Sequence, residues 1–170
     1  HILKGHVYRN NASSVDENFL PPRDLQALWV SQSSCDLSSA LGSQRNVYNP
    51  NVKVSRLLLL AGASPHFKTA FLQRAPLLGV YSHRGFEDMV AMLLEYGADV
   101  NASNEEGVTA LMFAAMRGHI DIVRLLIQHG ARLNQVDRND FCALVHAAKH
   151  GHLNVVEFLV SCDWDLLTES

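Results

Sequence analysis

The chain has 170 residues, of which 48% are hydrophobic and 18% are charged, values that are ordinary for a globular protein with a sizeable core. Its net charge of −3 gives no electrostatic reason to expect nucleic acid or an anionic membrane as the main partner. The apolar runs, such as Leu57 to Ala61, are too short to insert across a bilayer, and the start carries no signal-peptide pattern. Three cysteines without a CxxC spacing favour a reducing, cytoplasmic compartment over a disulfide framework.

Residues 1–34 carry no motif that indicates an activity. They begin with a short apolar and basic segment, continue into a polar Asn/Ser/Asp/Glu stretch, and reach Pro21-Pro22. Behind the prolines, Leu25, Leu28 and Trp29 fall at helical spacing and predict a short amphipathic helix. Since the chain begins without a methionine, we expect it to be part of a longer protein, with 1–34 as the tail of a preceding region and a helical linker.

Residues 35–63 are interpreted as a degenerate first repeat. Asp36 is expected to cap a short helix, and a further helix is predicted from about Val52 to Leu60, closing on Gly62. The segment VSRLLLLAGAS has the form of the closing half of a repeat, LLEYGAD, which is seen again at 93–99. Gly62 precedes the corresponding glycine by 35 residues, so we expect a small loop insertion near Ser64-Pro65-His66.

Residues 64–170 follow a period of 33 residues. Gly85, Gly118 and Gly151 keep this step, and so do Gly97 and Gly130. A period of this length is typical of a solenoid, in which each unit buries its apolar face by stacking on a neighbour. The sequence therefore predicts three regular units here.

Each regular unit is predicted to contain two helices and a polar finger. The first helices are expected at Leu77–Arg84, Ala110–Arg117 and Ala143–His150, and the second at Glu87–Tyr96, Ile120–His129 and Leu153–Ser161. Each first helix ends at a glycine that is suited to the left-handed backbone of a tight turn. The segments 103–107 and 137–140 have turn chemistry and are expected to project as β-turn fingers.

The stretch 107–134, GVTALMFAAMRGHIDIVRLLIQHGARLN, resembles the ankyrin repeat. That repeat has a G-x-T-P-L-H-x-A-A core, a Gly-His turn and a closing Gly-Ala-Asp-Val-Asn. The resemblance covers about 64–165 well and 35–63 weakly. It implies an all-α, ankyrin-repeat α-solenoid of helix-turn-helix units with β-turn fingers, preceded by a short helical N-terminal segment.

The last unit departs most from this pattern. Ala143 replaces the proline, as Ala110 does one unit earlier, while Cys142 replaces the threonine and Asp140 replaces the finger glycine. Val145 occupies the usual histidine position. These departures concern the hydrogen bond at the helix start of this unit, and leave the expected fold unchanged.

Several phrases resemble, more narrowly, the TANC family of large scaffolds. They are HILKGHVYRN, RDLQALWV, NVKVSRLLLLAGAS, APLL and CALVHAAKHGHLNVVEFLVSCDW. The resemblance implies an upstream P-loop ATPase-like region, of which 1–34 would be the tail, and a long ankyrin array. It also implies a cytoplasmic adaptor that acts in the postsynaptic density of dendritic spines in vertebrate members and in myoblast fusion in the insect member.

Two sets of residues are candidate protein-binding sites. An ankyrin stack presents a concave groove through the exposed ends of its first helices and through its fingers. We refer to the helix-end residues as the basic row: His83, Arg84, Met116, Arg117, Lys149 and His150. We expect this row to receive an acidic or phosphorylated peptide segment of a partner protein, and the alternative is that these are solvated polar ends.

The finger candidates are Glu105, Glu106, Arg138, Asn139 and Phe141. Aromatic and arginine side chains tend to anchor interfaces. Phe141 is expected either to serve in this way or to pack under its own finger.

The sequence indicates no metal, cofactor or catalytic centre. His146 and His150 are one helical turn apart, but His146 occupies a core position and His152 belongs to the Gly-His turn shared with His119. No nucleophile elbow, P-loop Gly-Lys-Ser/Thr, GxGxxG or acid/base pair is present, and Cys142 and Cys162 are interpreted as core residues. We therefore expect no enzyme activity.

Two functions follow from these patterns. The first is a protein–protein interaction module of a scaffold, and the alternative is a regulatory segment that controls an adjoining P-loop ATPase-like switch, with 1–63 as the hinge. The last unit is expected to close with Asp163-Trp164 instead of Gly-Ala. Since Leu159, Val160 and Trp164 are apolar, we expect an apolar end there and further repeats beyond it.

Overall fold

The computed structural model describes residues 37–168 of the chain, with the side chains described up to Cys162. Eight helices follow a helical turn at 37–41: α2 (Gln44–Tyr48), α3 (Val52–Leu60), α4 (Leu77–Arg84), α5 (Glu87–Glu95), α6 (Ala110–Arg117), α7 (Ile120–Gln128), α8 (Ala143–Lys149) and α9 (Leu153–Thr168). The predictions for residues 1–34, for Cys35 and Asp36 and for the Trp164 side chain lie outside the described residues.

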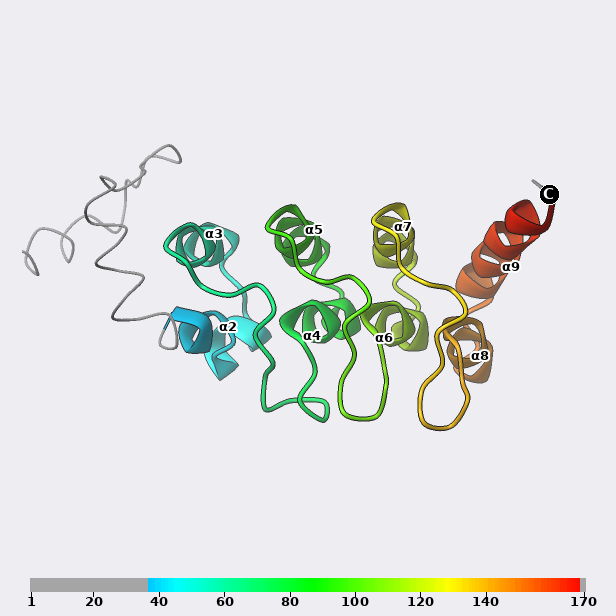
Figure 1. Cartoon of the computed structure of the whole chain (residues 1–170), viewed down its shortest axis with the longest axis horizontal. Coiled ribbons are helices and arrows are strands. Elements are labelled where there is room, and N and C mark those ends of the chain that lie inside the picture. The colour runs from blue at the N-terminus through cyan, green and yellow to red at the C-terminus, as the bar shows by residue number, and fades with distance from the viewer. Residues whose placement is uncertain (1–36, 169–170) are drawn as a thin grey trace, which may run out of the picture.

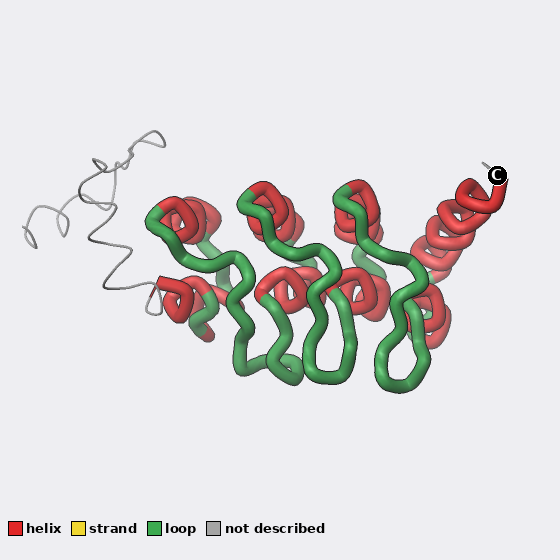
Figure 2. Tube along the Cα trace, viewed as in Figure 1, coloured by secondary structure: helices red, strands yellow, loops and turns green. Residues whose placement is uncertain are grey.

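The helices form two layers that advance along one axis (Figure 1). Helices α2, α4, α6 and α8 make the inner layer, and α3, α5, α7 and α9 make the outer layer. Long loops between the units project from one side of the inner layer (Figure 2). Within the described residues, extended structure is confined to two isolated bridges, so the predicted all-α solenoid is confirmed.

The glycine spacing predicted the helix boundaries closely. Helices α3, α4 and α6 have the expected bounds, whereas α5, α7 and α8 each end one residue earlier than expected. Gly85 and Gly118 adopt the left-handed conformation, with φ of 82° and 73°, and each stops the first helix of its unit. An L residue at such a position would be strained, which explains why the glycines recur at this step.

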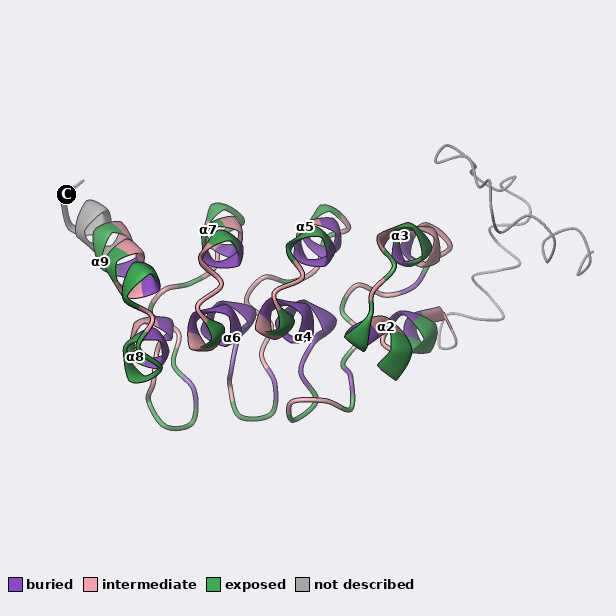
Figure 3. Ribbon diagram, turned by 180° about the vertical axis from the view of Figure 1, so that it is seen from behind, coloured by how far each residue is buried: buried purple, intermediate pink, exposed green. Residues whose placement is uncertain are grey.

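Stacking between neighbouring units produces one continuous core (Figure 3). Leu93, Leu111 and Leu126 are almost fully buried between the layers, and α4 packs on α6 as α6 packs on α8. Burying each such leucine contributes roughly 1.5–3 kcal/mol relative to exposure. The rigidity of the inner layer therefore depends on contacts between units, as expected for a solenoid.

A buried polar network fastens α2 and α3 to the regular units. The side-chain amide of Asn46 donates to the Leu41 carbonyl at 2.8 Å, to the Ser55 hydroxyl at 3.1 Å and to the Tyr81 hydroxyl at 3.2 Å. Tyr81 is fully buried, and this burial raises the pKa of its phenol. Because the network joins α2, α3 and α4, residues 37–63 are packed directly against the first regular unit.

The extra length of the first unit lies in its finger, and the prediction of an insertion near Ser64-Pro65-His66 is wrong. Finger 1 (68–76) closes with a main-chain hydrogen bond from Thr69 to Ala75, whereas finger 2 (103–109) closes from Asn104 to Val108. The first closure therefore spans two residues more than the second.

The additional residues of finger 1 are accommodated by a left-handed tip. Leu72, Gln73 and Arg74 have φ of 48°, 51° and 57° in succession. Such a run is uncommon for L residues other than glycine and asparagine, so it carried no recognisable signal in the sequence.

Helix α9 continues through Asp163-Trp164 to Thr168, and the predicted closing turn at these residues is wrong. The earlier outer helices end beside Gly97 and Gly130, which have φ of 81° and 86°. Without a glycine at the corresponding place, nothing forces the backbone out of the helix, so α9 extends. None of the described helices combines the length and apolarity needed to cross a lipid bilayer.

Candidate protein-binding surface

The basic row lies along the inner layer, at the C-terminal ends of α4, α6 and α8. Arg84, Arg117 and Lys149 are exposed, while His83 and Met116 are partly buried. Cations are favourable near the negative end of a helix dipole, so these positions suit basic residues. The structure thus brings the predicted row together on one surface.

Two cations of the row rest on aromatic rings. The guanidinium carbon of Arg84 lies 4.1 Å from the ring centroid of Tyr48, and the Lys149 ammonium lies 4.9 Å from that of Phe141. Such contacts contribute about 0.5–1 kcal/mol at exposed sites. They orient the side chains without neutralising their charge.

No carboxylate within the described part of the chain forms an ion pair with Arg84, Arg117 or Lys149. The basic side chains that do have carboxylate partners are Arg56, with Glu95, and Arg74, with Glu105, together with His146. Arg84, Arg117 and Lys149 thus form a row of positive charge along the inner helix ends, although the whole chain is slightly acidic.

The pKa of the His83 imidazole depends on its burial and on the cations of this surface. Burial is the main cause that lowers the pKa of its imidazole, and the charges of Arg117 and Arg84 lower it further. Its ring packs edge-on against Phe113, with the centroids 5.8 Å apart. A neutral histidine among fixed cations is thus the resting state expected near neutral pH.

The Gly-His turns connect consecutive units. The His152 imidazole donates through Nε2 to the Met116 carbonyl of the preceding unit at 3.0 Å. A Cβ at Gly118 would lie 2.5 Å from the His152 ring, and a Cβ at Gly85 would lie 2.7 Å from the His119 ring. Each glycine therefore leaves room for the histidine of the following unit.

Fingers 2 and 3 share one turn. Asn104 accepts main-chain N–H bonds from Glu106 and Val108 through Oδ1, and Asp137 does the same from Asn139 and Phe141 in finger 3 (137–141). Asp140 has φ of 62° and takes the left-handed position that Gly107 fills in finger 2. Such side-chain-to-backbone bonds explain why Asn and Asp begin these turns.

Neighbouring fingers are joined unequally. Between fingers 1 and 2, the Glu105 N–H donates to the Gln73 carbonyl at 3.0 Å, and the side-chain amide of Asn104 donates to the Leu72 carbonyl at 2.9 Å. The Lys68 ammonium adds a bond to the Ser103 carbonyl at 3.3 Å. Between fingers 2 and 3, the described residues form one main-chain bond, from Arg138 to the Glu106 carbonyl at 2.9 Å.

The finger candidates differ in exposure. Glu105, Glu106, Arg138 and Asn139 are exposed, as a binding role requires. Phe141 is partly buried, and its ring packs edge-on against His146 at a centroid separation of 5.8 Å. Of the two expectations for Phe141, packing at the base of its finger against α8 fits this geometry better.

Finger 3 is linked to α8 by a buried hydrogen bond between a histidine and a carboxylate that the sequence did not reveal. His146 donates through Nε2 to Asp137 Oδ2 at 2.9 Å, and the two residues are 7% and 6% exposed. His146 thus occupies the predicted core position. Cys142, at the start of α8, makes no capping hydrogen bond with its side chain, whereas Thr109 caps α6.

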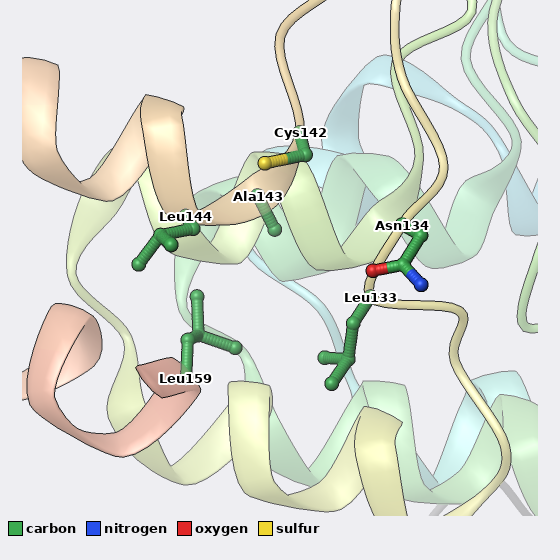
Figure 4. A pocket seen from close by; sticks show the side chains of 6 residues that line it. All are labelled: Leu133, Asn134, Cys142, Ala143, Leu144 and Leu159. Carbon is green, nitrogen blue, oxygen red and sulfur yellow. The ribbon is translucent and has the colours of Figure 1, made fainter. Parts of the chain in front are cut away.

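A shallow pocket at the last unit is lined by Leu133, Asn134, Cys142, Ala143, Leu144 and Leu159 (Figure 4). Cys142 and Cys162 are both partly buried, which makes the interpretation as core residues only partly correct. Among the side chains that the structure describes, no group of three His, Cys, Asp or Glu residues is arranged to hold a metal ion.

Sequence reasoning missed two aromatic residues at the start of the row. Tyr48 ends α2 and is 52% exposed, and Phe71 of finger 1 lies edge-on to it with the centroids 6.2 Å apart. Tyr48 precedes His83 by 35 residues, so the regular step of 33 did not align it with the other helix ends.

Comparison with known families gives one match. A family model described as ankyrin repeats, in three copies, matches residues 46–137 and, in an overlapping placement, residues 78–169. The two placements cover most of the chain. Proteins built from these repeats are typically interaction modules and not catalysts.

Proposed function

The chain belongs to the ankyrin-repeat family, whose repeats bind other proteins, and on that premise we propose that it is an interaction module of a cytoplasmic scaffold or adaptor. Its partner is a protein that presents an acidic or phosphorylated segment. The segment lies against the basic row and the exposed finger residues Glu105, Glu106, Arg138 and Asn139.

The regular placement of three exposed cations on consecutive inner helices supports this site. Arg84, Arg117 and Lys149 lie on consecutive inner helices without a carboxylate partner among the described residues. Charge-assisted hydrogen bonds to carboxylate or phosphate are stronger than neutral ones, and arginine binds both groups with two parallel bonds. A surface that is already positive and pre-oriented loses little freedom on binding.

The test is reversal of all three charges. In affinity capture with this chain as bait, we expect Arg84→Glu/Arg117→Glu/Lys149→Glu to lose partners that the wild type retains. Lys53→Glu/Arg124→Glu/Arg132→Glu changes the net charge equally at exposed positions outside the basic row and should retain them. Unchanged capture by the first variant, with its helical content and melting temperature intact, would show that the basic row is not the site.

The proposed location within the cell rests on the resemblance to the TANC scaffolds. It supports a cytoplasmic location at the postsynaptic density or the cell cortex, reached through partners. Imaging the tagged chain in neurons and in fusing myoblasts, beside the charge-reversed variant, tests this placement. A diffuse distribution of the wild type in both cell types would contradict it.

The proposed organisation comprises a degenerate repeat at 35–63, three repeats at 64–170 and a continuing array. The Asn101 side chain accepts a hydrogen bond from the Arg132 N–H of the next unit and donates one to the Gly130 carbonyl of that unit. Asn134 is the asparagine at the same position of the last unit. Val145 is 38% exposed, whereas Met112, one period earlier, is 1% exposed. Slower hydrogen exchange around Val145 in a longer chain would support the continuation.

A regulatory function is the second candidate. The bonds of Asn46 to Ser55 and Tyr81 leave no flexible linker between 37–63 and the regular units. A displacement of residues 37–63 would therefore be transmitted to the array. Comparing ATP hydrolysis by the longer protein with and without residues 64–170 tests this function, and equal rates would exclude it.

A further inference from the structure

The residue type at one structural position differs from unit to unit along the inner layer. Tyr48, His83, Met116 and Lys149 occupy the same place near the ends of α2, α4, α6 and α8. The series begins with an aromatic ring and ends with an ammonium group. The two ends of the surface therefore suit different side chains of a partner.

The first end is an aromatic platform, formed by Tyr48 and Phe71. Half of Tyr48 is exposed although its ring contacts both Phe71 and the Arg84 guanidinium. These contacts hold the ring in place, so little side-chain entropy remains to be lost when a partner binds. Exposed, well-supported tyrosines beside arginine are frequent anchors of protein interfaces.

The other end is basic. Arg117 and Lys149 are exposed, and neither has a carboxylate partner among the described residues. Lys149 is oriented by the Phe141 ring at 4.9 Å. Carboxylates of a partner are thus matched to this end by charge, and an apolar side chain is matched to the aromatic platform.

The distance between neighbouring units sets how many residues of a bound peptide separate the side chains that match them. Packed helices lie about 8–10 Å apart, and an extended chain advances about 3.3–3.6 Å per residue, so one unit corresponds to roughly three residues. On this estimate, Arg117 lies about six residues from Tyr48 along a bound strand, and Lys149 about nine.

We propose that this surface binds an extended peptide that carries an apolar residue on the Tyr48–Phe71 platform and carboxylates about six and nine residues away, opposite Arg117 and Lys149. This inference rests on the proposed function and adds the order of residues within the partner segment. Extended segments bind with low backbone cost when the receiving surface is rigid.

The test uses four fluorescein-labelled synthetic peptides of serine and glycine background, measured by anisotropy. The ordered peptide carries one leucine followed by glutamates about six and nine residues later. The shuffled peptide has the same composition with the leucine between the glutamates. The third replaces leucine by serine, and the fourth replaces the glutamates by glutamine. Each is measured in both chain directions.

We expect the best-bound direction of the ordered peptide to bind about tenfold more tightly than the shuffled peptide, because only the ordered one buries its leucine while both charges are matched. Tyr48→Ser should abolish this difference, Tyr48→Phe should keep it, and Val54→Ser on α3, another half-exposed apolar residue, should leave it unchanged. This pattern separates the platform from general surface hydrophobicity.

The remaining outcomes distinguish the two proposals. If the first three peptides bind equally and above the glutamine peptide, the aromatic platform is not part of the site, although the basic surface still binds acidic segments. If no peptide exceeds the glutamine peptide, both the order of residues and the acidic preference are overturned.

Discussion

The His146 imidazole donates to the Asp137 carboxylate at 2.9 Å, and this buried pair fixes finger 3 to the helix that follows it. One period earlier the corresponding residues are Asn104 and Phe113, which form no such pair. The finger turn itself is the same in both units, since Asn104 and Asp137 accept equivalent main-chain bonds. The last finger is therefore held by an additional, charge-assisted interaction.

His146→Phe is expected to destabilise the protein by about 1–3 kcal/mol, because it leaves one Asp137 oxygen buried without a partner. The double variant Asp137→Asn/His146→Phe copies the preceding unit and should recover most of the loss. Urea unfolding of both variants, beside Asp137→Asn alone, measures the coupling. Additive losses in this cycle would contradict a direct interaction.

The Asp137–His146 pair also predicts a dependence on pH. Burial alone would raise the pKa of Asp137, but main-chain hydrogen bonds from Phe141 and Asn139 together with His146 hold it below its ordinary value of 3.8. A depressed carboxyl pKa stabilises the fold fully above 3.8, and this stabilisation is lost as pH falls below 3.8 through the folded-state pKa. The wild-type advantage over Asp137→Asn in urea should therefore shrink below pH 4. A constant difference from pH 7 downward would contradict the assignment.

Gly118→Ala should be more destabilising than Gly151→Ala, although both residues follow the first helix of a unit. Both have positive φ, 73° and 76°, so both variants incur backbone strain of roughly 1–2 kcal/mol. Only at Gly118 does the added Cβ meet the His152 ring, which adds about 1–3 kcal/mol of overpacking. Thermal unfolding measures both variants, and adding His152→Ala should remove the excess at Gly118.

Arg74→Gly is expected to stabilise finger 1 by up to about 1 kcal/mol. Arg74 corresponds to Gly107 by the 33-residue step and has φ of 57°. Glycine relieves the left-handed strain, partly offset by its greater freedom in the unfolded chain. The exposed contact with Glu105 at 3.8 Å contributes little. Urea unfolding checks this, with Gln44→Gly in α2 as the opposite, destabilising control.

Binding of an acidic peptide should raise the pKa of His83. Burial and the nearby charges of Arg117 and Arg84 lower this pKa from 6.5 in the free protein. Carboxylates placed on those cations would offset their effect, and affinity should then increase as pH falls through the pKa of His83. Titration of the His83 ring by NMR, with the glutamate and glutamine peptides, measures the change. An identical pKa with both peptides would place the binding elsewhere.

The helices were predictable because glycine carries most of the boundary information. A glycine at 85 or 118 stops a helix regardless of the residues before it, so α4 and α6 have the predicted bounds. The same rule fails at Asp163, because aspartate tolerates the left-handed region but also fits a helix, and α9 continues through it.

The proposed binding surface was only partly predictable. The basic row follows directly from the period, but Tyr48 joins it through a unit of different length, and Phe71 belongs to the finger that contains the extra residues. The His146–Asp137 bond depends on where a finger folds back onto a helix. Such contacts depend on tertiary packing, and a pattern of residues along the sequence does not reveal them.

Neighbouring fingers are joined by different numbers of hydrogen bonds. The array should therefore resist stretching to different degrees along its length. Fingers 1 and 2 are held by three hydrogen bonds and the contact of Arg74 with Glu105, so they should move as one body. Finger 3 is tied to finger 2 through the Arg138–Glu106 bond, worth about 1 kcal/mol. A tensile load along the solenoid would therefore first separate fingers 2 and 3, between Glu106 and Arg138, while the leucine-rich core between the helices stayed intact.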